Sequence, residues 1–458
     1  MSANELGAQR LPEPLVRHIV LGGLKSWDAP PVRIPLAPMT LIFGQNSAGK
    51  SSMISALTLL RQTIMSERPF ELTSRGELVD VGSFRLAVHD HDLDSAITLG
   101  LGFTSPNPKA NTLLSADTLR ELSFAYTWDS EDEWAGRTRF NVDLGGYATS
   151  FELDSEGHYL PEDEDAQWRN FLESLAVARE VMPPLSPLGG RSIITRSDYD
   201  DPAGGLSEAD PLAAIRLGLS VQLSNELSEV LSRIAYLGPI RARPDRTDSL
   251  TTSGYKYVGP EGEHTTDVLY SDPALLAEVN EWFDKLGLGY RIKIVTPVSE
   301  EVKMTAGDFA VLGLIDTRDE TPNLVSPRAV GYGISQITPI VVQSLMSERG
   351  VVIIEQPEVH IHPRLQASVG DLLIHSVKER GNQMIVETHS EHLVLRLLRR
   401  IREGVIAPED VSILYVDVDS HGCAYVRRLD VDSDGDLIEG WPGGFFDERL
   451  EEVLGTRW

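Results

Sequence analysis

The chain has 458 residues, of which 41% are hydrophobic, and its 41 Lys and Arg against 69 Asp and Glu give a formal net charge of −28. This length predicts about three domain-sized units, and the composition excludes fibrous and disordered classes. The negative charge opposes indiscriminate binding to a polyanion, so contact with nucleic acid would need a local basic patch. No segment approaches the roughly 20 uninterrupted apolar residues of a membrane span, and the first residues lack an apolar signal core, so we expect a cytoplasmic protein without membrane contact.

The only cysteine is Cys423, which excludes an intrachain disulfide and any multi-cysteine metal cluster. Such sparse cysteine usage agrees with a reducing compartment. We expect this thiol to be inert.

A phosphate-binding loop is predicted near the N-terminus. The apolar residues 39–43 predict a strand, which runs into Gly44-Gln45-Asn46-Ser47-Ala48-Gly49-Lys50-Ser51 and then into a helical pattern that reaches about residue 66. The spacing G-x-x-x-x-G-K-[ST] curls a glycine-lined backbone around a triphosphate, so that N–H groups and the positive end of the helix face its oxygens. We therefore predict nucleotide binding.

Residues 106–235 differ in character from the α/β stretch before them. Pro106-Asn107-Pro108 breaks the chain, alternating segments between 122 and 153 predict a β-meander, and an acidic connector at 162–165 leads to helical patterns near 168–181 and 211–234. No sustained heptads point to a coiled-coil arm. We expect four units: a nucleotide-binding lobe at 15–105, an inserted β-meander with helices at 106–235, a second lobe at 236–400, and a small C-terminal α/β domain at 401–458.

Two groups of arginines are candidates for a local basic patch. They are Arg241, Arg243 and Arg246 in a loop-like stretch, and Arg396, Arg399, Arg400 and Arg402 along a helix. Either group could contact DNA, or it could consist of surface arginines paired with neighbouring carboxylates.

A second glycine-rich helix start is predicted at Gly331-Tyr332-Gly333-Ile334-Ser335-Gln336, which leads into the helical residues 337–346. The unpaired N–H groups of a helix N-terminus favour an anion. Because the chain already has one phosphate-binding loop, this helix end has most use on a nucleotide held by another copy. A glycine-rich turn with ordinary capping is the alternative.

Two later strands are expected to bring acids and a histidine to the nucleotide. The apolar residues 351–354 run into Glu355-Gln356-Pro357-Glu358, as a buried parallel strand that delivers a carboxylate would. Glu355 would hold Mg²⁺, directly or through water, opposite the Ser51 hydroxyl. The strand at 384–386 runs into Glu387-Thr388-His389-Ser390, where His389 could contact the terminal phosphate or orient the attacking water, or be structural.

The order of these motifs resembles the ABC-type ATPase heads of the RecF/SMC and OLD-like group. Within that group the chain is similar to bacterial AAA-type ATPases that carry a small C-terminal domain of unknown function, which the ending Trp441-Pro442-Gly443-Gly444-Phe445-Phe446-Asp447 resembles. The resemblance implies an α/β P-loop head, a mixed sheet with flanking helices, interrupted by the insertion.

In that group ATP is sandwiched between two heads. The resemblance therefore implies a homodimer or higher homo-oligomer with ATP and Mg²⁺ as cofactors, and it places His389 at the switch-histidine position. Residues implied to bind phosphates and Mg²⁺ in cis are Gly44, Asn46, Ser47, Gly49, Lys50, Ser51 and Ser52, and those implied to act in trans are Gly331, Gly333, Ser335 and Gln336.

Two departures from the wider ABC pattern bear on activity. The signature usually begins with a serine where this chain has Gly331, and Ser335 is the candidate substitute. The glutamate that activates water is replaced by Gln356, and losing such a base typically costs about 10² to 10⁴ in rate. Glu358 could replace it, or Glu358 and the nearby His360 or His362 could be structural parts of an intersubunit loop.

Two further acidic patterns are discounted as metal sites. The run Asp430-x-Asp432-x-Asp434-Gly435 imitates half of an EF-hand loop, but its twelfth position is Trp441, so we expect an acidic hairpin turn. Asp417-Val418-Asp419 resembles the D-x-D of TOPRIM nucleases, but no strand-end glutamate with its glycine accompanies it.

The predicted function is a slowly hydrolysing Mg-ATP-dependent head that dimerises on ATP, and the family context suggests a role in DNA metabolism or phage defence. The alternative is an essentially non-catalytic, ATP-gated regulatory subunit that controls a separate nuclease effector.

Overall fold

The computed structural model describes most of the chain. The described residues are 11–109, 112–131, 133–153, 159–161, 166–179, 211–244, 248–250, 254–296, 309–318, 321 and 323–442. The acidic connector at 162–165, Arg246 and the end of the C-terminal motif lie outside them. No helix among the described residues is long and apolar enough to cross a membrane.

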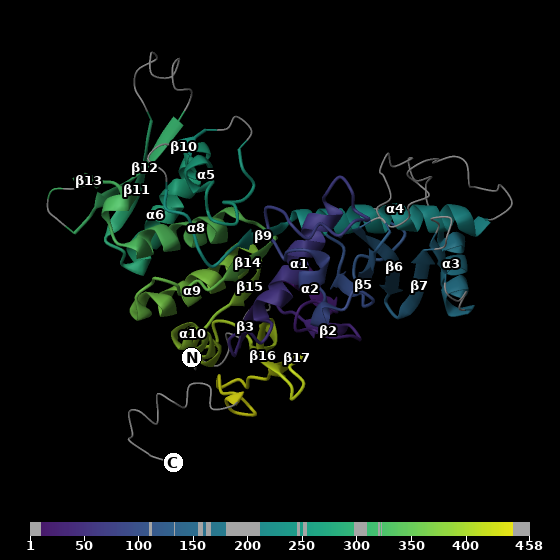
Figure 1. Cartoon of the computed structure of the whole chain (residues 1–458). Helices are drawn as coiled ribbons and strands as arrows, with labels where there is room; N and C mark the ends of the chain where they lie inside the picture. The colour runs from purple at the N-terminus through teal and green to yellow at the C-terminus, as the bar shows by residue number, and fades with distance from the viewer. Residues whose placement is uncertain are drawn as a thin grey trace.

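A six-stranded sheet lies at the centre of the molecule (Figure 1). Its order is β17-β16-β3-β15-β14-β9, in which β17 is antiparallel to β16 and all other neighbours are parallel. These strands are β3 (Met39–Gly44), β9 (Ile234–Leu237), β14 (Val351–Glu355), β15 (Gln383–Glu387), β16 (Val411–Val418) and β17 (Ala424–Leu429). The near-continuous apolar runs of its parallel strands are those of a sheet covered on both faces, and the strands expected at 39–43, 351–354 and 384–386 are confirmed.

Alternate residues of the central strands enter two different cores. Ile42, Ile385 and Leu414 belong to the core shared with helix α1 (Lys50–Ile64), whereas Leu41, Val386 and Ile413 belong to the core on the opposite face. The helices of that opposite face are α8 (Tyr332–Met346), α9 (Pro363–Arg380) and α10 (Glu391–Arg402). This is the period-two alternation of a strand, and it fixes the sheet between two helical layers.

The strands of the expected insertion do not form a sheet of their own. They extend a seven-stranded antiparallel sheet, order β2-β1-β4-β5-β6-β7-β8, that the N-terminal strands begin. Its members are β1 (Val16–Gly22), β2 (Val32–Pro35), β4 (Ile97–Phe103), β5 (Arg120–Asp129), β6 (Trp134–Leu144), β7 (Tyr147–Leu153) and β8 (Tyr159–Pro161). The P-loop helix α1 lies between this sheet and the central one (Figure 1).

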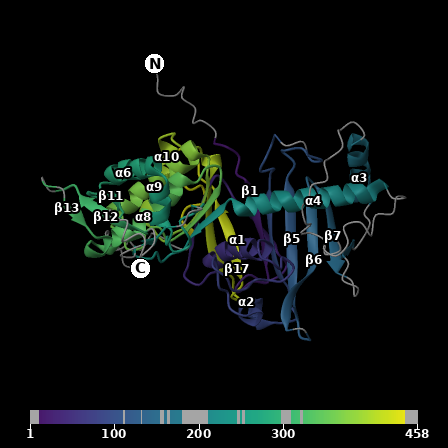
Figure 2. The same ribbon diagram turned by 90° about the horizontal axis from the view of Figure 1, so that it is seen from above.

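One face of the antiparallel sheet is covered by helices α3 (Ala166–Arg179) and α4 (Pro211–Ser232). The long helix α4 lies across the strands β5 to β7 (Figure 2), and its buried leucines join the core of α1. Both helices fall where the sequence predicts them. The short elements α2 (Phe84–Ala87) and η1 (His89–His91) precede β4.

A smaller antiparallel sheet packs against helices beside α8. It contains β10 (Asp248–Ser249), β11 (Tyr290–Val295), β12 (Phe309–Asp316) and β13 (Asn323–Val325), and the helices are α5 (Thr265–Ser271) and α6 (Pro273–Leu286). Short 3-10 turns at Pro327–Ala329 and Pro408–Asp410 precede α8 and β16. This layer belongs to the same core as α8 and α9.

The C-terminal segment completes the central sheet. Strand β16 pairs in parallel with the P-loop strand β3, and β17 folds back on β16. After β17, the Asp432 carboxylate accepts hydrogen bonds from the N–H groups of Asp434 and Asp436, so the expected acidic hairpin turn is confirmed. In the preceding turn, the Asp419 carboxylate likewise accepts from the N–H groups of His421 and Cys423.

A buried ion pair ties the antiparallel sheet to α4. Arg120 on β5 is fully buried, and its Nε donates to Glu226 Oε2 at 2.7 Å. The same carboxylate also accepts from Gln222 Nε2 at 3.2 Å. A buried guanidinium that loses its carboxylate stays desolvated and uncompensated, which costs far more than the intact pair contributes.

We expect Glu226→Ala to lower the free energy of unfolding by about 3 to 5 kcal/mol. The matched control is Glu229→Ala on the same helix, whose partner Arg233 is one-third exposed, and its cost should stay under about 1 kcal/mol. Urea unfolding followed by circular dichroism measures both. Equal costs would show that burial of the Arg120 pair has no energetic consequence.

Candidate nucleotide site

The P-loop conformation requires glycine at both ends. Gly44 has φ +145°, and a Cβ there would lie 2.0 Å from the Val416 carbonyl oxygen. Gly49 has φ +102° at the N-cap of α1, and a Cβ there would lie 2.5 Å from Ser26 Oγ. Between them, Gln45 to Ser47 are exposed, so the loop backbone is accessible to a ligand. The loop therefore has the glycine-dependent geometry on which phosphate binding at a helix N-terminus relies.

The lysine of the loop lies folded across it. Lys50 Nζ donates to the carbonyl oxygens of Gly44 at 3.1 Å and Gln45 at 2.5 Å, and the side chain is buried. Burial lowers the pKa of Lys50, and the nearby carboxylate of Glu387 opposes that shift. An ammonium held only by carbonyl oxygens is poised to exchange them for phosphate oxygens. The next residue but one, Ser52, is buried in the first turn of α1.

The carboxylate beside the P-loop serine is Glu387, a residue to which the sequence analysis assigned no role. Ser51 Oγ donates to Glu387 Oε2 at 2.9 Å and lies 3.2 Å from Oε1. Glu387 ends β15, the neighbour of the P-loop strand β3. The sequence feature that could have identified Glu387 was its position at the end of an apolar run, directly before the Thr-His-Ser motif.

The expected metal ligand Glu355 lies next to Glu387 instead of against Ser51. The two glutamates are register partners at the ends of the parallel strands β14 and β15. Tyr236 on β9 donates its hydroxyl to Glu355 Oε1 at 2.8 Å. Burial first, and then the charge of Glu387, raise the pKa of Glu355 to about 7, and burial also raises the pKa of Glu387. Two buried carboxylates beside a hydroxyl form an oxygen-rich site that fits a hard divalent cation.

The loops that follow these two strands are joined by Glu358. Its carboxylate accepts from Thr388 Oγ1 at 2.8 Å and from the His389 N–H at 2.5 Å. Glu358 therefore binds the loop of residues 388–390 after β15, which we call the switch loop because it carries the expected switch histidine. Gln356 has φ +44°, and its N–H donates to the Glu387 carbonyl oxygen at 2.8 Å. The structure thus gives Glu358 a bridging role.

His389 lies at the surface, close to the P-loop lysine, and is partly covered by neighbouring residues. Partial burial and the positive charge of Lys50 lower the pKa of His389. The ring is therefore neutral near pH 7 and able to accept a hydrogen bond. The other two histidines of this region make contacts within the chain: His360 packs edge-on against the ring of Tyr332, and His362 Nδ1 accepts from the Arg364 N–H at the start of α9.

Arg241 is buried and is not part of a surface patch, so it fits neither of the two alternatives offered for its group, a DNA contact or a surface ion pair. Its side chain is fully buried and donates to the carbonyl oxygens of Glu355 and Gln356. Gln336 holds the Arg241 backbone, donating from Nε2 to its carbonyl oxygen at 2.7 Å. Burial lowers the pKa of Arg241 to about 10, against the opposing charges of Glu358 and Glu355, so it stays charged at neutral pH. Arg241 is thus a positioning residue between α8 and the loop after β14, and the sequence analysis missed this role.

The second arginine group is paired with carboxylates. Arg396 and Arg400 both bind Asp371 on α9, Arg399 binds Glu403, and Arg402 binds Asp436. This is the alternative that the sequence left open, so the group offers little unpaired positive charge to a phosphate backbone.

The predicted trans residues separate into two pairs at the start of α8. Gly331 is exposed, and a Cβ added to it would meet nothing within 4 Å. Gly333 packs against the His360 carbonyl oxygen, which would lie 2.8 Å from an added Cβ. By contrast, Ser335 and Gln336 are buried in their own chain. Only the glycine end of the motif is therefore open to a second molecule in this conformation.

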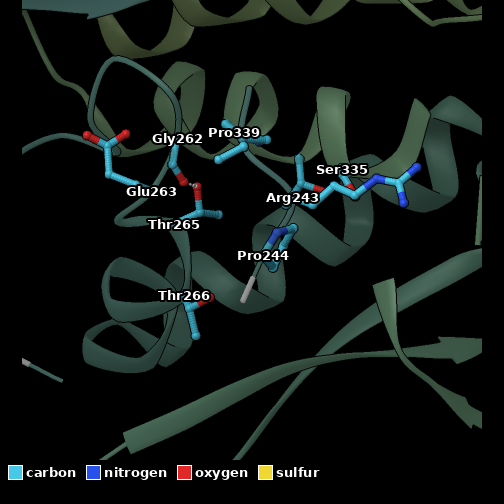
Figure 3. Close-up of a pocket in the computed structure, with 10 residues that line it drawn as sticks. Arg243, Pro244, Gly262, Glu263, Thr265, Thr266, Ser335 and Pro339 are labelled. Carbon is cyan, nitrogen blue, oxygen red and sulfur yellow. Dashed lines mark hydrogen bonds between the residues drawn. The ribbon is translucent and has the colours of Figure 1, made fainter. Parts of the chain in front are cut away.

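Ser335 faces a small cavity, of about 50 Å³, on the side of α8 that faces α5. Figure 3 shows this cavity, whose lining residues are Ala242, Arg243, Pro244, Gly262, Glu263, Thr265, Thr266, Ser335, Thr338 and Pro339. Among the described residues, none forms a hydrogen bond with the Ser335 hydroxyl. A cavity of this size holds one or two waters. Its position does not support a substitute role for Ser335 in the nucleotide signature.

The comparisons with known families place an ATPase domain in the second half of the chain. Residues 287–394 match the AAA ATPase domain, and residues 406–454 match a protein of unknown function (DUF3696). These two matches confirm the predicted AAA-type ATPase domain and the small C-terminal domain of unknown function. No curated protein matches the chain.

Among solved structures, similar chains are heads of Smc proteins. An Smc head with an extended coiled coil from Pyrococcus furiosus, bound to the C-terminal domain of ScpA, is 14% identical, with coverage of 97% of this chain and 100% of that chain and a TM-score of 0.46. An SmcHead bound to the C-winged helix domain of ScpA is 14% identical (91% and 98%, TM-score 0.44). The SMC head domain from Thermotoga maritima is 12% identical (92% and 100%, TM-score 0.40).

The raised pKa of Glu355 predicts a pH-dependent stability. The folded protein keeps a proton on Glu355 up to about pH 7, whereas the unfolded chain releases it near pH 4.5. The stabilising contribution is thus fully present below pH 4.5 and is lost as the pH rises through about 7. Relative to Glu355→Gln, which cannot ionise, the wild type should lose about 3 kcal/mol of unfolding free energy between pH 4.5 and pH 8.

Urea unfolding in the presence of a chelator, at several pH values, measures this difference. Glu281→Gln, on the exposed face of α6, is the matched control and should show no such trend. A difference between wild type and Glu355→Gln that stays constant with pH would contradict the assignment.

Proposed function

We propose that this protein binds Mg-ATP at the P-loop and hydrolyses it slowly. The observation that carries the proposal is the contact of Ser51 with Glu387, because Glu387 is one of two neighbouring buried carboxylates at the ends of β14 and β15. A like-charged buried pair is unfavourable unless a proton or a cation neutralises it. Lys50 next to this pair supplies positive charge for the phosphates.

Ser51, Glu387 and Glu355 are the residues that would hold Mg²⁺. When bound, the ion would neutralise phosphate charge and orient the terminal phosphoryl group. Lys50 would exchange its two carbonyl contacts for phosphate oxygens, and the P-loop N–H groups would bind the remaining ones. Neutral His389, beside Lys50, can accept a hydrogen bond from an attacking water.

Slow turnover follows from the residues at the usual position of the base. The Gln356 amide cannot take a proton from water, and Glu358 is occupied by Thr388 and the His389 backbone. Losing a positioned base typically costs about 10² to 10⁴ in rate. We therefore infer an ATPase whose ATP-bound state persists for longer than that of an enzyme with a glutamate at this position.

We also infer that ATP joins two copies. The start of α8 presents exposed Gly331, and no side chain of the described residues caps its first-turn N–H groups, so the partial positive charge of this helix end suits a phosphate of another copy's nucleotide. Behind this surface, Gln336 and Arg241 connect the helix to the loop after β14. Binding of a second molecule to this surface would therefore affect the positions of Glu355 and Gln356 through these contacts.

Phosphate release at saturating Mg-ATP tests the catalytic part. Lys50→Ala should lower turnover by at least about 10²-fold, since it removes a charge aimed at the transferring group. Glu387→Gln should weaken Mg-dependent ATP binding, and Glu281→Gln should leave both readouts unchanged. Unaltered turnover in Lys50→Ala would refute the site.

Light scattering with and without a non-hydrolysable ATP analogue tests dimerisation. We expect the wild type to double in mass with Mg²⁺ and the analogue. Gly331→Leu should remain monomeric while keeping its melting temperature and its ATP affinity, because φ is −58° and the space around Gly331 is open within its own chain. Glu281→Leu on α6 is the control for an added surface leucine. A wild type that stays monomeric when saturated with Mg-ATP would overturn this part.

Gln356 and the engaged Glu358 also favour a second candidate, a non-catalytic switch. In that case the protein binds ATP tightly, releases no phosphate, and uses closure to hold or release a separate effector such as a nuclease. Tight binding by the wild type without turnover would select this candidate. A setting in DNA metabolism or phage defence rests on the resemblance of the motifs, and the paired arginines of α10 give it no support.

A further inference from the structure

Three segments that are far apart in sequence meet behind the P-loop and bring together an aspartate, a histidine and a cysteine. Asp28 lies in the loop between β1 and β2, His89 begins the 3-10 turn before β4, and Cys423 lies in the turn between β16 and β17. One ligand atom from each lies within 4.8 Å of the other two. The site is separate from the acids around Ser51.

The histidine is oriented as a metal ligand would be. Its Nδ1 lies 2.6 Å from the Lys25 carbonyl oxygen, which can only accept, so Nδ1 carries a proton, and in the neutral ring the lone pair is then on Nε2. Metal-binding histidines usually donate the N–H of the ring nitrogen that does not bind the metal to an acceptor such as a backbone carbonyl, which fixes the tautomer in this way. The His89 side chain is only 14% exposed.

The free nitrogen points at the other two side chains. Nε2 lies 4.0 Å from Cys423 Sγ and 3.8 Å from Asp28 Oδ1. Tetrahedral zinc, with bonds of about 2.0 to 2.3 Å, needs separations of about 3.4 to 3.6 Å. The two separations from Nε2 therefore need to contract by only a few tenths of an ångström, whereas the ligand atoms of Asp28 and Cys423, which lie within 4.8 Å of each other, need to approach by at most about 1.2 Å. Asp90 Oδ2, 3.6 Å from the same nitrogen and exposed, can approach as a fourth ligand.

We propose that Asp28, His89 and Cys423 form a structural zinc site. A thiolate and an imidazole select a borderline-soft ion such as Zn²⁺ over Mg²⁺, which prefers oxygen ligands alone. The fourth position is filled by Asp90 or by water.

The site connects to the P-loop through the neighbours of its ligands. Trp27 Nε1 donates to the Gly49 carbonyl oxygen at 3.0 Å, and the Ala424 N–H donates to the Ser26 carbonyl oxygen at 2.7 Å. Around Gly49, an added Cβ would lie within 3.2 Å of Ser26, Trp27 and Ala424. Zinc would therefore fasten the two segments that pack against the phosphate loop.

The test uses the full chain, stripped with a chelator and dialysed into excess Mg²⁺. After zinc is added back and the excess is removed, we expect one zinc per chain by elemental analysis and a higher melting temperature than that of the stripped protein. Cobalt added in place of zinc should give a thiolate-to-metal charge-transfer band. Cys423→Ser and His89→Ala should lose the band and at least about 100-fold in zinc affinity, the upper end of what losing even an outer-shell partner costs.

His91→Ala is the matched control, because His91 Nδ1 instead contacts the Arg85 carbonyl oxygen. It should retain the cobalt band. Lys50→Ala should also retain full zinc binding, which separates this site from the nucleotide site. Zinc binding that survives Cys423→Ser, or the absence of any zinc-dependent change in the folded wild type, would overturn the proposal.

Discussion

Two glutamates at the ends of adjacent parallel strands impose the main constraint on this molecule. The register of β14 and β15 places Glu355 beside Glu387, and the fully buried strands leading to them exclude the water that would separate their charges. The sheet therefore maintains an unfavourable pair that a proton or a cation relieves. Ser51 and Tyr236 donate hydrogen bonds to these carboxylates without neutralising them. The proposed cation site thus depends on the backbone pairing of the sheet.

The loops around this pair are linked so that a change at one is transmitted to the others. Arg241 binds the carbonyl oxygens that follow Glu355 and is itself held by Gln336 of α8, while Glu358 binds the switch loop. Each of these contacts is charge-assisted or buried, so none exchanges easily with water. Events at the start of α8 and at the phosphate loop are therefore coupled through a short path of hydrogen bonds. The P-loop is connected in a similar way to the turn that carries Cys423. Ser26 accepts a backbone hydrogen bond from the end of that turn, and Ser26 and Trp27 pack against Gly49.

Sequence reasoning succeeded where local pattern and backbone requirement coincide. The apolar runs before Gly44 and Glu355 form strands because a sheet buried on both faces needs such runs, and the P-loop glycines adopt conformations that only glycine tolerates. It failed for Arg241, since an arginine in a polar loop looks like a surface residue until the fold buries it. It also separated the strands at 122–153 from the first lobe, although they extend the sheet of that lobe, because a break in composition at Pro106 does not show which sheet edge the next strand joins. For Glu387, the local signal existed, but its contact with Ser51 depends on the order of strands.

The sequence by itself determined the glycine-dependent loop between β3 and α1, two acid-bearing strand ends and an AAA-type ATPase motif order, because these depend on short spacings and on the burial demands of single strands. Tertiary structure decided which acid meets Ser51, which arginine is buried, and that residues as distant as Asp28, His89 and Cys423 converge. The physical reason is that strand order and register are set by packing between segments hundreds of residues apart. Local propensity and spacing carry no information about that packing.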